Sequence, residues 1–242
     1  MKTMFQLAWT HRGKVMREAG TYSRYYLRSL RDARGILEKV DVAALDRLRD
    51  RYRDQSSPPE FTKYLDASAF VRVALACAYR LDLHRSTPMT ILDIGTGAGY
   101  FPLVCRHFGH DVIACDVDDD PVLNDITALL DIGRRPWRVM PFENGPDFGR
   151  RFDLVTAFQL GFDRAGADGQ VVFWGEEQWD FFLKDIATNY LNPDGGVLLS
   201  GFNREERQGP KVLQPFIDRG ALVHDGRIHF KSMQAFQQTR QI

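Results

Sequence analysis

The feature that most constrains this chain is a turn with a glycine at every second position, placed between an apolar run and a helical stretch. The apolar run covers residues 90–94, and Gly95, Gly97 and Gly99 follow it directly. Glycine has no Cβ, so it adopts positive φ and lets backbone N–H groups approach a ligand closely. An apolar strand followed by such a turn and then by a helix predicts a parallel α/β sheet, with a ligand bound at the carboxyl end of its first strand.

The rest of the chain after Pro88 fits that expectation, because short apolar runs alternate with helical stretches. We predict strands over 90–94, 112–115, 137–140, 154–158 and 197–200, with helices over 101–108, 121–130 and 176–190. Asp225-Gly226 is a strong two-residue turn signal and predicts a hairpin of 222–223 with 227–230. The expected fold is a doubly wound, mostly parallel, Rossmann-like α/β sheet with a C-terminal antiparallel hairpin.

The first third of the chain differs in pattern. Residues 22–40 and 41–53 are rich in helix formers, and Pro58 and Pro59 cannot continue a helix. A further helix is predicted over 66–83 from its apolar spacing. We therefore expect an N-terminal helical extension over 1–57 and a Rossmann-like domain over 58–242.

The charge balance limits the classes of partner. Lys plus Arg and Asp plus Glu are both 32, so the net charge is zero and a general nucleic-acid binder is disfavoured. Residues 1–54 nevertheless hold 13 Lys or Arg against 7 Asp or Glu, and Tyr22, Tyr25 and Tyr26 interleave with the arginines. A partner or nucleic-acid surface is one interpretation of that segment, and a solvated helical face is the one we favour.

The remaining compositional signals concern compartment and metal. The three cysteines are odd in number and lack the paired spacing of a zinc site, which favours a reduced, cytoplasmic protein. No apolar run reaches the ~20 residues of a membrane helix, and the first 20 residues lack the apolar core of a signal peptide. We expect no metal, since Asp118, Asp119 and Asp120 precede Pro121 as turn and capping residues do.

The glycine spacing separates two cofactor classes. A dinucleotide fingerprint needs Gly-x-Gly-x-x-Gly, whereas here the order is Asp-x-Gly-x-Gly-x-Gly, beginning at Asp93. This order resembles motif I of the class I S-adenosylmethionine-dependent methyltransferases, in which the acid helps to hold the methionine part of the cofactor. The resemblance extends over residues 88–202 in the correct order. It implies that Asp116 binds the ribose hydroxyls and that Val117 lies against the adenine.

The third strand departs from the family pattern, because Met140 stands at its end where many members have an acid. We expect Phe142 to flank the adenine and Glu143 to reach its edge. The resemblance thus implies a binding site for S-adenosylmethionine made of the following residues: Asp93, Gly95, Gly97, Gly99, Asp116, Val117, Phe142, Glu143 and Phe158.

The acceptor site is expected after the fourth strand, beside the methyl donor. The candidates there are Gln159, Asp163, Phe173 and Trp174, which offer aromatic walls and polar groups. No residue identifies itself as a general base, and His107 and His110 are interpreted as surface or capping groups at a helix end. The expected reaction is O- or N-methylation of a small molecule or a glycan-like acceptor.

Two other classes of function stay open at this stage. One is a scaffold that binds the cofactor without transfer, and the other is an RNA or protein methyltransferase that uses its basic N-terminal helices for partner binding. A nucleotide-dependent oxidoreductase is disfavoured by the glycine spacing.

Overall fold

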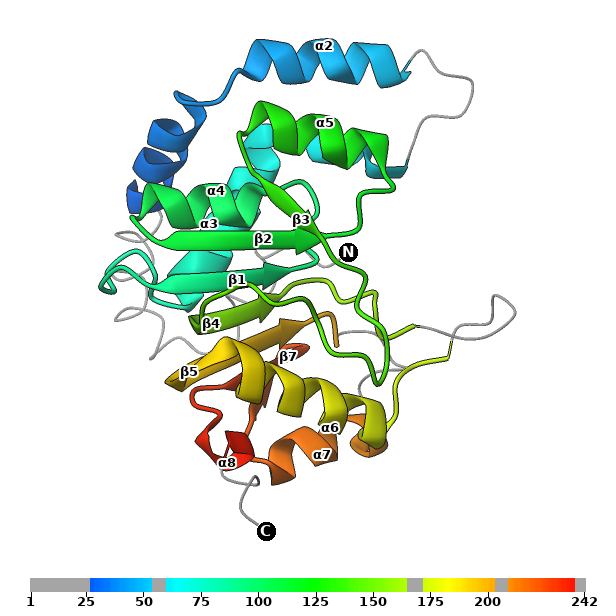
Figure 1. Ribbon diagram of the computed structural model, residues 1–242. Helices are drawn as coiled ribbons and strands as arrows, with labels where there is room; N and C mark the ends of the chain where they lie inside the picture. The colour runs from blue at the N-terminus through cyan, green and yellow to red at the C-terminus, as the bar shows by residue number, and fades with distance from the viewer. Residues whose placement is uncertain (1–26, 54–59, 165–171, 203–208, 238–242) are drawn as a thin grey trace, which may run out of the picture.

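The structure is a computed structural model that describes residues 27–53, 60–164, 172–202 and 209–237. Its centre is a seven-stranded sheet with the order β3-β2-β1-β4-β5-β7-β6, drawn in Figure 1. The strands are β1 (Thr90–Ile94), β2 (Asp111–Asp116), β3 (Arg134–Pro136), β4 (Phe152–Ala157), β5 (Leu191–Ser200), β6 (Leu222–His224) and β7 (Arg227–Phe230).

Strands β1 to β5 pair in parallel, and only β7 runs antiparallel to its neighbours β5 and β6. The turn of the β6–β7 hairpin contains Asp225 and Gly226, both with positive φ, as the Asp-Gly signal predicts. The expected mostly parallel sheet with a C-terminal antiparallel hairpin is therefore confirmed.

Helices cover both faces of the sheet, and each face has its own core. Adjacent residues of one strand point to opposite cores: Ile91 packs with the N-terminal helices, whereas Leu92 packs with the C-terminal ones. The first group holds a helix over 27–37, α2 (Val42–Arg53), the 3-10 helix η2 (Glu60–Leu65), α3 (Ala67–Arg80), α4 (Tyr100–His107) and α5 (Pro121–Leu129). The second holds α6 (Glu176–Asp185), the π-helix η4 (Ile186–Tyr190), α7 (Pro210–Asp218) and α8 (Gln234–Gln237).

Capping residues begin two of these helices where the sequence indicates. The Asp120 side chain accepts a hydrogen bond of 3.0 Å from the Leu123 amide, and Pro121 occupies the first helical position of α5. The Asp66 side chain does the same for α3 through the Ala69 amide, at 3.0 Å. The capping interpretation of Asp120 is thus confirmed.

The N-terminal helices pack on the helices of the sheet. The Tyr52 hydroxyl donates to the Asp125 carboxylate of α5 at 2.7 Å, and the Tyr100 hydroxyl of α4 donates to the Tyr64 carbonyl at 2.7 Å. The boundary at residue 57 stays a prediction, because residues 54–59 lie outside the described part of the chain.

The described part of the basic segment carries its arginines in local ion pairs. These include Arg34 with Glu38, Arg49 with Asp46 and Arg53 with Asp50, and Arg51 also contacts Asp125. Such pairing directs these arginine side chains to carboxylates of the same surface, which agrees with a solvated helical face. The three interleaved tyrosines, Tyr22, Tyr25 and Tyr26, lie outside the described residues.

The third strand lies three residues earlier than the sequence predicts. It was expected over 137–140, whereas β3 is Arg134–Pro136. β3 pairs with β2 only as far as Pro136, which faces Asp116 at the end of β2, and Trp137 adds one further hydrogen bond to the Asp116 carbonyl at 2.9 Å. Beyond that point β2 offers no partner, so the apolar residues Trp137 and Val139 pack into the core instead.

Three smaller differences concern single elements. The expected helix over 176–190 is an α-helix only to Asp185 and continues as a π-helix. β5 begins at Leu191, six residues before the expected start. His110 is not a surface group: it is 4% exposed, and its Nδ1 accepts from the Met89 amide at 3.0 Å while its Nε2 lies 2.8 Å from the Leu83 carbonyl.

Other features bear on compartment and metal. Cys77, Cys105 and Cys115 are free thiols. None of the described helices is both long and apolar enough to cross a bilayer. Within the described residues, no group of three or more His, Cys, Asp or Glu side chains is arranged to hold a metal ion.

Candidate functional site

The turn between β1 and α4 has the backbone that the glycines predict. Gly95, Gly97 and Gly99 have φ values of +70°, +57° and +81°, which side chains rarely tolerate. A Cβ added at Gly95 or Gly97 would meet no atom within 4 Å, so open space lies beside both residues. A Cβ at Gly99 would instead lie 3.0 Å from the Ile132 side chain. The first two glycines therefore leave room for a ligand, and the third lets the turn pack against Ile132.

Asp116, at the end of β2, is bound to this turn. Its Oδ2 accepts a hydrogen bond of 2.6 Å from the Gly97 amide, and its Oδ1 accepts one of 2.8 Å from the Val117 amide. Burial raises the pKa of Asp116, and the two amides oppose that rise. The structure thus brings together three residues of the expected cofactor site, Gly97, Asp116 and Val117.

Asp93, the acid of the glycine motif, lies beneath the turn and is only 1% exposed. Its Oδ1 accepts a hydrogen bond of 2.7 Å from the Thr156 hydroxyl of β4. Burial raises the pKa of Asp93 to about 7, because an apolar environment penalises the ionised form, while Thr156 lowers it and the nearby Asp116 raises it. A perturbed carboxyl group at the end of a central strand is typical of a functional site.

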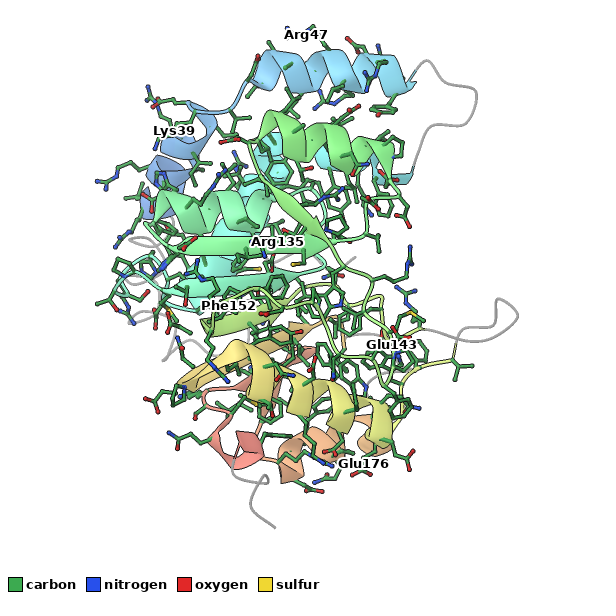
Figure 2. The ribbon with its side chains drawn as sticks, in the orientation of Figure 1. Lys39, Arg47, Arg135, Glu143, Phe152 and Glu176 are labelled. Atoms are coloured by element: carbon green, nitrogen blue, oxygen red, sulfur yellow. The ribbon has the colours of Figure 1, made fainter. Side chains whose placement is uncertain are left out.

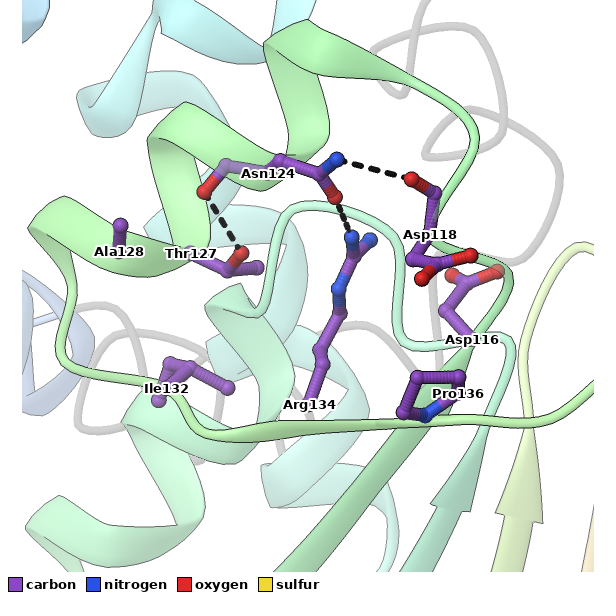
Figure 3. A pocket seen from close by; sticks show the side chains of 8 residues that line it. All are labelled: Asp116, Asp118, Asn124, Thr127, Ala128, Ile132, Arg134 and Pro136. Carbon is purple, nitrogen blue, oxygen red and sulfur yellow. Dashed lines mark hydrogen bonds between the residues drawn. The ribbon is translucent and has the colours of Figure 1, made fainter.

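A pocket of about 360 Å³ opens beside Asp116, between α5 and the sheet edge at β3. Figure 3 shows its lining: Asp116, Asp118, Asn124, Thr127, Ala128, Ile132, Arg134 and Pro136. Arg134 extends between Asp116 and Asn124, donates to the Asn124 side chain, and lowers the pKa of Asp116 by its charge. The Asn124 amide in turn donates to the Asp118 carbonyl at 2.9 Å. The pocket therefore has a mixed polar and apolar lining, and Asp116 joins it to the glycine turn.

The end of β4 contributes the next two candidates. The Phe158 ring packs edge-on against Phe101 of α4, with centroids 4.6 Å apart. Gln159 is exposed and has a φ of +56°, a conformation that costs a residue with a side chain about 1–2 kcal/mol. Its amide donates to the Ser200 hydroxyl at 3.2 Å. Strained backbone held by a neighbour is typical of sites that bind ligands.

Phe142 and Glu143 lie in the loop that follows β3. Phe142 is 53% exposed and has a φ of +62°, and its ring contacts Phe181 of α6 at 5.8 Å between centroids. Glu143 is exposed in the same loop, on the side of the molecule where β1 and β2 end, as Figures 1 and 2 show. Both residues therefore lie along the carboxyl edge of the sheet.

The acceptor candidates after Gln159 are buried or half-buried, whereas Gln159 itself is exposed. Trp174 is 5% exposed, and its ring packs in an aromatic cluster with Phe162 at 5.3 Å and Trp179 at 5.0 Å. Asp163 is also buried, and its carbonyl accepts from the Trp174 amide at 2.9 Å. Phe173 is half-buried beside them. Of the four candidates, only Gln159 is exposed at the strand ends.

Sequence reasoning missed several residues of this site. Thr156 was not singled out because its role depends on strand register, which places it opposite Asp93. Arg134 was missed because β3 was expected three residues later. Asn124 and Thr127 were considered only as part of a helix, although their i, i+3 spacing places both on one face of α5.

This chain is similar in fold to several solved structures. No family model and no curated protein matches this chain. Among solved structures it is similar to the ribosomal protein L11 methylase of Lactobacillus delbrueckii subsp. bulgaricus, with 21% identity over 67% of this chain and 76% of that one and a TM-score of 0.42. It is similar to CalS10, an S-adenosylmethionine-bound amino pentose methyltransferase of Micromonospora echinaspora, with 19% identity over 65% and 56% of the two chains and a TM-score of 0.40.

A third similar structure is the sugar N-methyltransferase KedS8 of a Streptoalloteichus species, with 16% identity over 55% of this chain and 49% of that one and a TM-score of 0.38. This chain thus spans about half the length of the two sugar methyltransferases. The order of the strands is that of a Rossmann-like fold. At these identities the likeness concerns the fold, so the function is argued from the geometry of the site.

Proposed function

We propose that this protein is an S-adenosylmethionine-dependent methyltransferase whose cofactor lies over the turn between β1 and α4. The observation that carries the proposal is the hydrogen bond from the Gly97 amide to the Asp116 carboxylate, with open space beside Gly95 and Gly97. A ligand that approaches this turn meets backbone groups and carboxylates together.

The residues of the turn fit that cofactor. Each oxygen of the Asp116 carboxylate accepts one backbone N–H and keeps a further lone pair, which suits the two hydroxyl groups of a ribose. Asp116, and Asp93 in its ionised form, place negative charge near the turn, which favours the ammonium and sulfonium groups of the cofactor and would repel a pyrophosphate. When bound, S-adenosylmethionine supplies an electrophilic methyl group on a sulfonium leaving group.

We further propose that the acceptor is a small molecule or a glycan-like compound, methylated at oxygen or nitrogen. Of the acceptor candidates, Gln159 is exposed where β4 ends and offers an amide for hydrogen bonding, and Phe173 is half-buried and offers an apolar surface, which suits a small polar ligand. An RNA substrate is disfavoured, because the described arginines of the N-terminal helices contact carboxylates.

The organisation of the protein follows from the same proposal. We assign residues 1–57 to a helical extension and 58–242 to the methyltransferase domain, with the extension covering α4 and α5 through contacts such as Tyr52 with Asp125. The three free thiols support a cytoplasmic location.

The test is thermal unfolding with S-adenosylmethionine, S-adenosylhomocysteine, NAD or no ligand. At a ligand concentration about 100-fold above the dissociation constant, linkage stabilises the protein by ~2.7 kcal/mol, which is roughly 5 to 11 °C for a chain of this size. We expect the shift with both adenosyl ligands, no shift with NAD, and a smaller shift in Asp116→Ala. A shift with NAD alone, or none in folded and ligand-free protein, overturns the proposal. Methyl transfer from labelled cofactor to a panel of sugars and amines then identifies the acceptor.

A further inference from the structure

The loop over residues 137–149 follows β3, precedes β4 and contacts α6 on its way. It leaves β3 beside Asp116, where the Trp137 amide donates to the Asp116 carbonyl at 2.9 Å. It then passes along the side on which β1 and β2 end and reaches α6 before it returns to β4, as Figure 1 shows. Phe142 and Glu143 lie in its middle, so its path decides where these two residues stand relative to the glycine turn.

The carboxyl group of Asp185 binds this loop from α6. Asp185 is the last residue of α6 and is 6% exposed. One of its oxygens, Oδ2, accepts a hydrogen bond of 3.1 Å from the Gly145 amide, and the other, Oδ1, accepts one of 2.6 Å from the Asn189 side chain. A buried carboxyl group bonded to the backbone of a loop restricts that loop more than a surface contact does.

Gly145 has no room for a side chain at this contact. A Cβ there would lie 2.3 Å from the Trp137 ring and 2.5 Å from the Tyr190 hydroxyl. The Tyr190 hydroxyl also donates to the carbonyl of Pro146, the next residue, at 3.2 Å. Asp185 and Tyr190 thus bind two successive loop residues from the two ends of the π-helix segment.

The π-helix itself points to a function beyond packing. Such single turns are rare and occur frequently at functional sites. Here the π-helix over Ile186–Tyr190 separates Asp185 from Tyr190 and lets both reach the same loop. The Phe142 ring against Phe181 adds a third contact between α6 and the loop.

We propose that Asp185 is a positioning residue of the cofactor site: through the Gly145 amide it holds the 137–149 loop in the path that presents Phe142 and Glu143 at the carboxyl edge. This inference rests on the proposed function, since the ligand it concerns is S-adenosylmethionine. Asp185 itself contacts no ligand in this arrangement and acts through the loop.

The experiment measures S-adenosylhomocysteine binding by calorimetry and amide hydrogen exchange over residues 141–149. Asp185→Ala removes both acceptors, and we expect about tenfold weaker binding and faster exchange at Gly145. Asp185→Asn keeps one oxygen for the Gly145 amide if the Asn189 side chain rotates, so we expect it to retain most of the affinity.

Two further variants complete the experiment, one as a control and one as a second test of the loop. Asp180→Ala, on the same helix, removes an acid that contacts Lys184 and Arg219 but none of the described loop residues, and we expect wild-type binding. Tyr190→Phe removes only the hydroxyl that donates to Pro146, so it loosens the loop with little change in volume and replaces Asp185→Ala if that variant does not fold.

The outcomes separate the two proposals. If wild-type protein does not bind S-adenosylhomocysteine, the proposed function fails and this inference falls with it. If wild-type protein binds, and Asp185→Ala (or Tyr190→Phe where Asp185→Ala does not fold) binds equally well or exchanges no faster over 141–149, the positioning role is wrong while the proposed function stands. Weaker binding with faster exchange confined to the loop, and rescue in Asp185→Asn, supports the role.

Discussion

The Thr156 hydroxyl donates a hydrogen bond of 2.7 Å to the Asp93 carboxyl group, and both side chains are buried. The two residues face each other across the parallel strands β1 and β4. The strand register therefore places a donor beside the acid of the glycine motif. This contact and the burial of Asp93 act on its pKa in opposite directions, and burial dominates.

The binding of S-adenosylmethionine is expected to depend on pH through Asp93. Its pKa is raised from 3.8 to about 7, and the cationic cofactor favours the ionised form. Affinity should therefore level off above about pH 7 and fall as the pH drops below it, by up to about tenfold per pH unit. Calorimetry from pH 5 to pH 9 measures this profile, and Asp93→Asn should flatten the part below pH 7. A wild-type profile identical to that of Asp93→Asn contradicts the assignment.

The stability of the free protein should show the opposite trend. Between pH 3.8 and about 7 the folded state holds a proton on Asp93 that the unfolded state releases. The contribution of Asp93 to the free energy of unfolding thus falls as the pH rises through that window and is constant above it. Urea unfolding of wild-type protein and Asp93→Asn across the window measures the difference. A contribution that rises with pH would show that Asp93 has a lowered pKa instead.

Thr156→Val removes the hydroxyl group and keeps the shape of the side chain. Since Thr156 lowers the pKa of Asp93, its loss should move the midpoint of the binding profile to higher pH. It should also cost about 1–3 kcal/mol of stability at pH 8, where Asp93 is ionised. Thr127→Val is the matched control, because the Thr127 hydroxyl is buried but donates to carbonyls of its own helix. An equal midpoint in the two variants would refute the coupling.

Asp116→Asn tests the link between β2 and the glycine turn. The carboxylate accepts from the Gly97 and Val117 amides, and a carboxamide would set its NH2 group against one of these donors. We expect S-adenosylhomocysteine binding to weaken by roughly 10- to 100-fold. Asp118→Asn is the control, because the hydrogen bond from Asn124 goes to its backbone carbonyl. Calorimetry compares the two, and equal losses would mean that pocket charge, not the turn, governs binding.

Gly97→Ala tests whether a ligand occupies the open space beside the turn. The residue has a φ of +57° with no atom near an added Cβ, so the folding cost is backbone strain of about 1–2 kcal/mol. Gly220→Ala carries the same kind of strain at a φ of +86°, also with no atom within 4 Å, after α7. Both variants should lose similar stability in thermal unfolding, but only Gly97→Ala should lose cofactor affinity. Intact binding in Gly97→Ala would show that no ligand approaches that residue.

The local parts of this protein could be predicted from the sequence. The glycines at 95, 97 and 99, the capping Asp120 with Pro121 and the Asp225-Gly226 turn all have the conformations that their residue types require. Each depends on a few consecutive residues, where backbone freedom and local hydrogen bonds decide. The fold class could also be predicted, because a sequence of alternating strands and helices leaves few possible arrangements for a parallel sheet.

The remaining features were decided by contacts between distant residues. β3 ends at Pro136 because its partner β2 ends at Asp116, so the apolar pattern of 137–140 was used for packing. Asp93 meets Thr156, and Gly145 meets Asp185, across separations of 63 and 40 residues. Periodicity shows which side chains are buried but not which of them meet, because register and helix docking are set by the packing of the whole core. The sequence by itself thus determined the turn and the class of fold, and the tertiary structure decided which side chains surround the turn.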